Sequence, residues 1–285
     1  MGGENSLAMP VVTLGLALII FLAGAVAGGL GALLGIGGGV FLVPFLTLGL
    51  GFPIGTAAAI SLATVIATSS SVSSSRAGQH LINLRLAMVL EVITAGGSLL
   101  GGMTAQLLAE STLDKLFGVV AAVVGVIMLS RIQRRNVLLD PTADPGLLGG
   151  RFFDEESGGM VTYQVKRLPV ALLASFVAGN LSSLLGIGGG VIKVPALNAW
   201  CGVPLRAAAA TSAFMIGVTA AAGAIIYYGR GQLDPALAGT AVLGVQLGSW
   251  GGVRLGERTS ASWLKLLMAL VLFFVSAMMF VRGTS

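Results

Sequence analysis

The chain has 285 residues, of which 55% are hydrophobic and only 9% are charged, and its mean hydropathy is +0.96. Soluble globular proteins average about a quarter charged residues, so this composition excludes a water-soluble domain and indicates an all-α polytopic membrane protein. The net charge of +5 does not indicate nucleic-acid binding. The basic residues cluster near the ends of apolar segments, where they set membrane orientation.

Charged side chains divide the chain into three parts. Eleven of them lie between residues 131 and 167. On both sides of this region, stretches with few or no charges are long enough for several helices of the ~20 residues that cross a bilayer. We therefore predict a first transmembrane repeat at 1–130, a charged cytoplasmic linker at 131–167 and a second transmembrane repeat at 168–285.

Residues 27–46 and 178–197 are two copies of one motif. Their sequences, AGGLGALLGIGGGVFLVPFL and AGNLSSLLGIGGGVIKVPAL, are identical at 14 of 20 positions. The same offset of 151 residues also pairs Pro53 with Pro204. The chain therefore consists of two copies of one unit.

The basic residues predict that the two copies have opposite orientations. Arg76 and Arg85 flank one loop of the first copy, whereas Arg254 and Arg258 mark a different turn of the second. Short loops rich in Lys and Arg stay in the cytoplasm. We predict two inverted-topology repeats in a plasma membrane, with the linker inside and both termini outside.

In each copy, the first helix is predicted to break at a run of glycines. The first helix runs from about Val11 to Leu34 and breaks at residues 35–39, because adjacent glycines are poor helix formers. Residues 186–190 repeat this break in the second copy.

A short helix is predicted after each break. Pro44 fits the first turn of a helix that extends to about Leu50, and Pro195 takes the same place in the second copy. A helix of this length is too short to cross the membrane, so it is predicted to be re-entrant.

Two glycine breaks at matching positions of inverted repeats predict a substrate site near the membrane midplane. Backbone groups freed at that depth must be buried in protein or line a wet cavity. A short helix that begins there offers free N–H groups and the positive end of its dipole, which favour an anion. Close helix packing is the alternative explanation of the glycines. The candidate substrate-binding residues are Gly35, Gly37, Gly38, Gly39, Pro44, Gly186, Gly188, Gly189, Gly190 and Pro195.

Three polar residues distinguish the second break from the first. Lys193 stands where the first copy has Leu42, and Asn180 and Asn198 lie nearby in the sequence, so all three join the candidate site. A lysine inside a membrane segment costs roughly 2.5–3.5 kcal/mol on insertion scales, so it faces a cavity or a partner unless it snorkels to the interface.

Glu91 is the one acidic residue outside the linker that we predict to be embedded in a helix. Three roles are open to it. It pairs with a basic group, carries a coupling proton, or lies near the headgroups as a charge that sets topology.

The two GIGGGV segments with their following prolines resemble the TauE/SafE family of membrane permeases, and the resemblance covers nearly the whole chain. It implies an integral plasma-membrane carrier for small anions, associated with the export of sulfite and organosulfonates. The glycines and prolines named above occupy the family's signature positions.

We expect a secondary transporter that exports a small, sulfur-containing anion by alternating access. An anion channel and a non-transporting membrane sensor or structural protein are the alternatives. No enzyme is expected, since intramembrane proteolysis lacks its GxGD or HExxH motif. One cysteine and one histidine predict no metal site and no cofactor. The expected partners are the substrate and the lipid bilayer, with no nucleic acid, while proton or sodium coupling and a homodimer are left open.

Overall fold

The computed structural model describes residues 13–34, 37–76, 81–130, 144–154, 159–256 and 261–284. Its elements form two helical series separated by a short β-hairpin. In chain order they are α1 (Leu14–Leu34), α2 (Gly39–Pro44), η1 (Phe45–Gly49), α3 (Ile54–Arg76), α4 (Leu84–Ala105), α5 (Glu110–Ser130), β1 (Gly150–Asp154), β2 (Gly159–Tyr163), α6 (Leu168–Leu185), α7 (Gly190–Ala199), α8 (Leu205–Gly229), α9 (Pro235–Gly256) and α10 (Ala261–Thr284).

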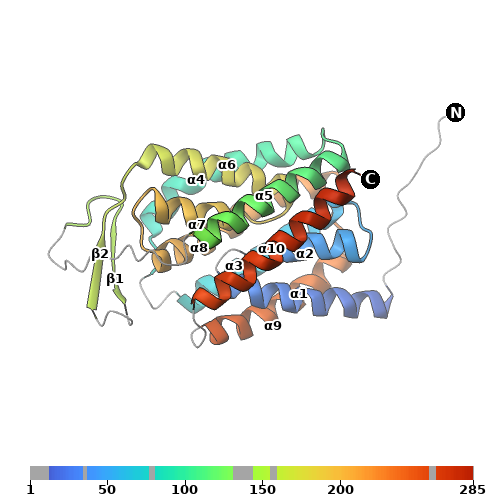
Figure 1. Cartoon of the computed structure of the whole chain (residues 1–285), viewed down its shortest axis with the longest axis horizontal. Helices are drawn as coiled ribbons and strands as arrows, with labels where there is room; N and C mark the ends of the chain where they lie inside the picture. Colours follow the sequence, from blue (N-terminus) through green and yellow to red (C-terminus); the bar gives the residue numbers. More distant parts are fainter. Residues whose placement is uncertain are drawn as a thin grey trace.

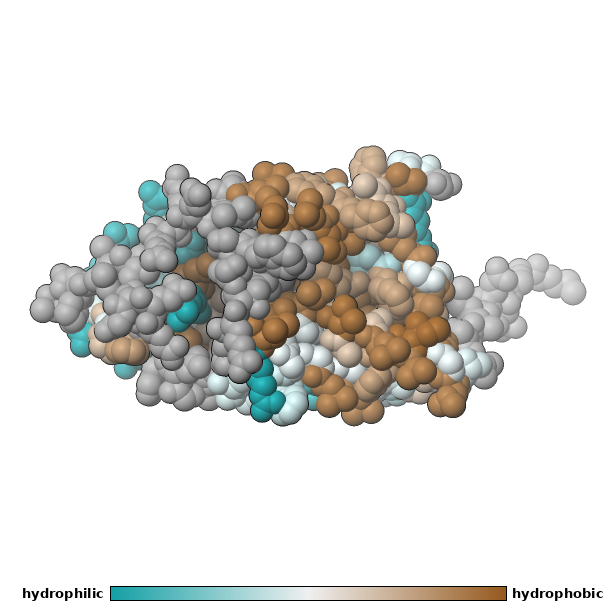
Figure 2. Space-filling model, turned by 60° about the horizontal axis from the view of Figure 1, so that its bottom comes forward, coloured by the Kyte–Doolittle hydropathy of each residue, from teal (hydrophilic) through white to brown (hydrophobic). Residues whose placement is uncertain are grey.

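The helices are those of a polytopic membrane protein. Among the described residues, α1, α3, α4, α6 and α8 are long and apolar enough to span a membrane. Helices α5, α9 and α10 have 21, 22 and 24 residues, which is also the length of a span. Hydrophobic side chains gather on the helical part of the face shown in Figure 2. The fold class predicted from composition is confirmed to this extent.

The β-hairpin lies at one end of the helices, and the last residues of α10 lie at the other (Figure 1). We call these the hairpin end and the C-terminal end. The hairpin is antiparallel and pairs Gly150 with Tyr163. Asn83, which caps α4, donates from Nδ2 to Leu148 O at 2.8 Å and to Tyr163 Oη at 3.2 Å. Nothing in the sequence analysis predicted this hairpin within the linker.

Burial explains how the hairpin is held. Phe152, Val161 and Tyr163 are buried in one apolar cluster with Cys201 and Leu86. Burial also raises the pKa of the Tyr163 phenol. The hairpin is thus packed against the beginning of α4 and the α7–α8 turn.

Polar contacts fix the direction in which several helices run. Helix α4 begins beside the hairpin and ends at Gln106, whose Nε2 donates to Oε1 of Gln232 in the α8–α9 turn at 3.0 Å. The first residues of α3 also lie at Gln232, because a Cβ at Gly55 would be 3.2 Å from its Nε2. The α4–α5 turn and the α8–α9 turn therefore share the C-terminal end.

Two pairs of helices approach through glycine. Helix α1 packs along α9, where Gly28 contacts Val245 and Gly252 contacts Gly29. Helix α4 packs along α6 in the same way, with Gly101 against the backbone of Asn180. Residue numbers rise together along both contacts, so each pair is parallel. We call these two contacts the glycine seams.

Two further pairs complete the arrangement. Helix α3 packs against α8, and α5 packs against α10. Every one of these four pairs joins a helix before the hairpin to a helix after it, so the two series of helices share one core.

The prediction that Pro44 and Pro195 lie in the first turns of new helices is wrong. Pro44 is the last residue of α2, and Pro195 lies in the middle of α7. The glycines themselves begin both helices, because Gly39 and Gly190 already have helical conformation. A proline inside a helix removes a hydrogen bond and crowds the preceding turn. After Pro44, the chain continues in the wider π-helix η1.

Candidate functional site

The two glycine breaks come together beside the middle of α3 and α8. A Cβ placed on Gly37 would lie 3.4 Å from Ile216 Cδ1 and 3.5 Å from Val65 Cγ2, and one on Gly188 would lie 2.9 Å from Val65 Cγ1. Val65 and Ile216 are equivalent positions of the two copies, at the offset of 151 residues. We call this meeting point the central junction.

Direct contacts join the two breaks. Ser61 Oγ of α3 donates to Gly186 O at 2.6 Å, and Gly39 packs against the same carbonyl and against Ile187. Gly186 has a φ of +72°, which favours glycine. Its Cβ would also lie 2.6 Å from Ala58 Cα. The glycines therefore serve both backbone conformation and close approach.

Helix α7 leaves the second break with Lys193 in its first turn. Gly189, with a φ of +70°, precedes the helix, and its carbonyl accepts the backbone N–H of Lys193 at 3.1 Å. Lys193 is only 1% exposed. Burial to this degree excludes the alternative in which the lysine snorkels to the interface.

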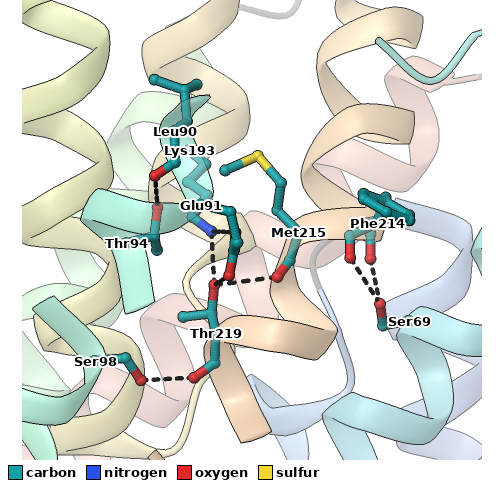
Figure 3. A network of polar contacts seen from close by, with 10 residues as sticks. Ser69, Leu90, Glu91, Thr94, Ser98, Lys193, Phe214, Met215 and Thr219 are labelled. Atoms are coloured by element: carbon teal, nitrogen blue, oxygen red, sulfur yellow. Dashed lines mark hydrogen bonds and ion pairs between the residues drawn. The ribbon is translucent and has the colours of Figure 1, made fainter. Parts of the chain in front are cut away.

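Lys193 meets Glu91 and Thr219 inside the protein (Figure 3). Its Nζ donates to Thr219 Oγ1 at 2.9 Å and lies 3.6 Å from Glu91 Oε2. The Thr219 hydroxyl lies 2.7 Å from Glu91 Oε1 and can donate to it. Of the three roles left open for Glu91, the structure shows the pairing with a basic group. We call these three residues the charged cluster.

A chain of hydroxyls connects the charged cluster to the second break. Ser98 Oγ donates to Thr219 O at 2.6 Å and lies 2.9 Å from Ser183 Oγ. Tyr227 Oη donates to Ser183 O at 2.9 Å. Ser183 is three residues before Gly186. Sequence reasoning missed these hydroxyls, although isolated polar residues in apolar helices are a signal for them.

Three other predicted site residues, Asn180, Asn198 and Gly38, make packing or turn contacts. Asn180 is part of the α4–α6 seam, where its backbone contacts Gly101. Asn198 Nδ2 donates to Val203 O at 2.9 Å and so ties the end of α7 to the following turn. Gly38 packs against Ala27. Gly35 lies outside the described residues.

A narrow apolar pocket lies beside the second break. It runs between α5, α10 and the break, and its lining is entirely hydrophobic. The lining residues are Val40, Phe117, Val120, Ala121, Val124, Leu185, Ile187, Val191 and Leu272. Because this lining offers no polar side chain to an anion, the pocket is not itself an anion site.

Glu91 is not the one acidic residue in a helix outside the linker. Asp114 lies in α5 and is 4% exposed, and its Oδ2 is 3.6 Å from Arg282 Nε of α10. Helix α5 begins at Glu110 and therefore includes Asp114 in its second turn. This second ion pair lies at the C-terminal end, away from the central junction.

Helices of spanning length around two broken helices and a buried charged cluster define a polytopic membrane transporter. The chain belongs to the sulfite exporter TauE/SafE family, whose model matches residues 20–279. The resemblance seen in the GIGGGV segments is thereby confirmed.

Three relatives cover most of the chain. The probable membrane transporter protein YunE of Bacillus subtilis is 25% identical over 273 residues, which cover 93% of this chain and 98% of YunE. A probable membrane transporter protein of Methanocaldococcus jannaschii is 24% identical, over 89% of this chain and 91% of its own length. YdhB, also a probable membrane transporter protein of Bacillus subtilis, is 25% identical, over 83% and 87%. No solved structure matches the chain.

Proposed function

We propose that this protein is a secondary transporter of the plasma membrane that exports a small, sulfur-containing anion, such as sulfite or an organosulfonate, by alternating access around the central junction. The single observation that carries the proposal is the meeting of the two glycine breaks, with Ser61 Oγ bonded to Gly186 O. Broken helices at matching positions of two repeats are the usual place of a transporter's substrate site. The family description supports the substrate class.

The directions of the helices support an inverted repeat. Helix α9 is equivalent to α4 at the offset of 151 residues, yet the α8–α9 turn that begins α9 shares its end of the molecule with the α4–α5 turn, where α4 ends. In parallel repeats these two turns would lie on opposite sides of the membrane. An inverted pair of halves gives a carrier two related conformations, one open to each side.

The second break has the chemistry for an anion. Helix α7 has ten residues and begins directly after Gly189, so its first N–H groups have no partner within the helix. Lys193 adds a positive charge in the same turn. Moving one negative charge outward through an inside-negative potential releases ~2.3 kcal/mol per 100 mV, which favours export.

The function is tested with detergent-purified protein and with proteoliposomes. We expect sulfite or an organosulfonate such as sulfoacetate or taurine to raise the melting temperature more than chloride at equal concentration, since a ligand of the folded state stabilises it. In liposomes the same anion should show saturable flux and exchange. Flux without saturation or exchange would indicate a channel, and no shift and no flux for any anion would contradict transport of these anions.

The orientation is tested by cysteine labelling in a Cys201→Ala background. Leu107 in the α4–α5 turn is 84% exposed, Arg230 in the α8–α9 turn is exposed, and Leu147 beside the hairpin is 87% exposed. We expect an impermeant reagent to label Leu107→Cys and Arg230→Cys from outside the cell and Leu147→Cys only after permeabilisation. Labelling of Leu107→Cys and Arg230→Cys from opposite sides would contradict the inverted repeat. If Leu147→Cys were labelled from outside, and Leu107→Cys and Arg230→Cys only after permeabilisation, the prediction that both termini lie outside would be wrong.

A further inference from the structure

The ion pair at the centre of the charged cluster is incompletely hydrogen-bonded. Glu91 Oε2 lies 3.6 Å from Lys193 Nζ, beyond the usual hydrogen-bond range, and this oxygen is buried without a hydrogen-bond partner. The lysine ammonium has three protons, of which the structure shows one engaged, with Thr219. Lys193 therefore keeps donors for a further acceptor, and Glu91 is loosely held on the side that faces it.

Lys193 lies within one helical turn of the break at which an anion would bind. Side chains of a helix lean toward its N-terminus, and Lys193 is only four residues after Gly189. The carboxylate of Glu91 comes from α4, a different element. The ammonium of Lys193 is thus paired with a carboxylate from α4 and belongs to the same short helix whose first N–H groups could bind an anion.

Thr219 allows the carboxylate to leave without exposing an unpaired hydroxyl. Its Oγ1 has a single proton and two acceptors within reach, Glu91 Oε1 at 2.7 Å and Met215 O at 3.1 Å. When Glu91 moves away, the hydroxyl donates to Met215 O in its own helix and still accepts from Lys193. The cost of an unsatisfied buried donor is avoided.

From these contacts, and resting on the proposed function, we propose that Glu91 is the resident anion of the substrate site. Its carboxylate occupies the position at Lys193 that an oxyanion of the substrate takes, and binding of the substrate displaces it. The affinity of the site is therefore set by competition between substrate and Glu91. The competition favours anions that bring several oxygen acceptors to Lys193 and to α7 together, as a sulfite or sulfonate group does.

The displacement also reaches the second break. The Ser98 hydroxyl donates to Thr219 O and contacts Ser183, which lies in α6 just before the glycines. A movement of the Thr219 backbone during substrate binding is passed along this short chain to the end of α6. The exchange of anions at Lys193 is thereby connected to the element whose rearrangement alternating access requires.

The test measures sulfite binding to the full-length protein in detergent by calorimetry. Glu91→Gln removes the competing charge but keeps an oxygen that can accept from Thr219, so it should bind sulfite about ten-fold more tightly than the wild type, a gain of ~1.4 kcal/mol. Lys193→Met should bind roughly ten- to a hundred-fold more weakly. Glu110→Gln removes an exposed acidic charge from α5 and serves as the matched control, with unchanged affinity.

The signs of these changes separate displacement from a structural ion pair. If Glu91 only balanced the charge of Lys193, Glu91→Gln would bind sulfite equally or more weakly, and the proposal would be wrong. Should Glu91→Gln fail to fold, Glu91→Asp withdraws the carboxylate by one methylene and should also bind more tightly, and equal or weaker binding by that variant would overturn the proposal. Absence of sulfite and sulfonate binding in the wild type would instead contradict the proposed function.

Discussion

Replacing Gly39 by alanine is expected to prevent the protein from folding stably. The new Cβ would overlap Gly186 O and would lie against Ser61 Oγ and Ile187 Cα. Two of these three atoms belong to the backbone of the second break, so no change of rotamer relieves the overlap. Overpacking a core usually costs 1–3 kcal/mol, and we expect about 3 kcal/mol or more here because backbone must move.

Gly96→Ala is the matched control for this prediction. Gly96 also lies in a helix, but a Cβ placed on it meets nothing within 4 Å. Alanine favours the helix over glycine by up to about 1 kcal/mol, so this variant should be as stable as the wild type or slightly more stable. The measurement is the melting temperature and the yield of monodisperse protein in detergent. Equal melting temperatures for the two variants would contradict the close contact of the breaks.

Glu91→Leu is expected to destabilise the protein by about 3–5 kcal/mol. The substitution removes the carboxylate and leaves Lys193, which is 1% exposed, as a buried charge without its counter-ion. Unlike Glu91→Gln, it also removes the oxygen that accepts from Thr219. The free energy of unfolding is measured by denaturant titration in detergent micelles.

The double variant Glu91→Leu/Lys193→Met shows where that loss comes from. A buried ion pair replaced by apolar side chains of similar volume is often neutral or stabilising, because neither charge then has to be desolvated. We therefore expect the double variant to recover most of the stability but not to bind sulfite. A double variant as unstable as Glu91→Leu would show that the loss arises from packing and not from the unpaired lysine.

The repeat made much of the architecture predictable. An offset of 151 residues relates the six elements from α1 to α5, among them η1, to the five from α6 to α10, with α2 and η1 together equivalent to α7, and the glycine runs lie where the first helix of each series ends. These features are local, because they depend on backbone preference and on helix length. Pro44 and Pro195 were misplaced for the same reason. Proline is most favourable at a first turn, but glycine with a suitable backbone conformation begins the helix earlier.

The site was only partly predictable. A lysine and a glutamate in apolar segments must each have a partner or an exit to water, so Lys193 and Glu91 could be singled out individually. Their pairing depends on how α4, α7 and α8 pack. The two residues are 102 positions apart in the sequence, and no local sequence pattern predicts a contact at that separation. Thr219 carries even less signal, since a threonine in an apolar helix ordinarily bonds to its own backbone. The hairpin was missed because its charged neighbours suggested a linker and nothing more.

The glycine seams determine which parts of the molecule can move separately. In them the glycines of α1 and α9, and those of α4 and α6, lie directly against backbone atoms of the partner helix, so the partners cannot slide without overlap. A rearrangement that preserves these contacts carries α1 together with α9 and α4 together with α6. Each such rigid body takes one helix from each copy of the repeat. In the proposed transport cycle, the repeated unit and the rigid body are therefore different sets of helices.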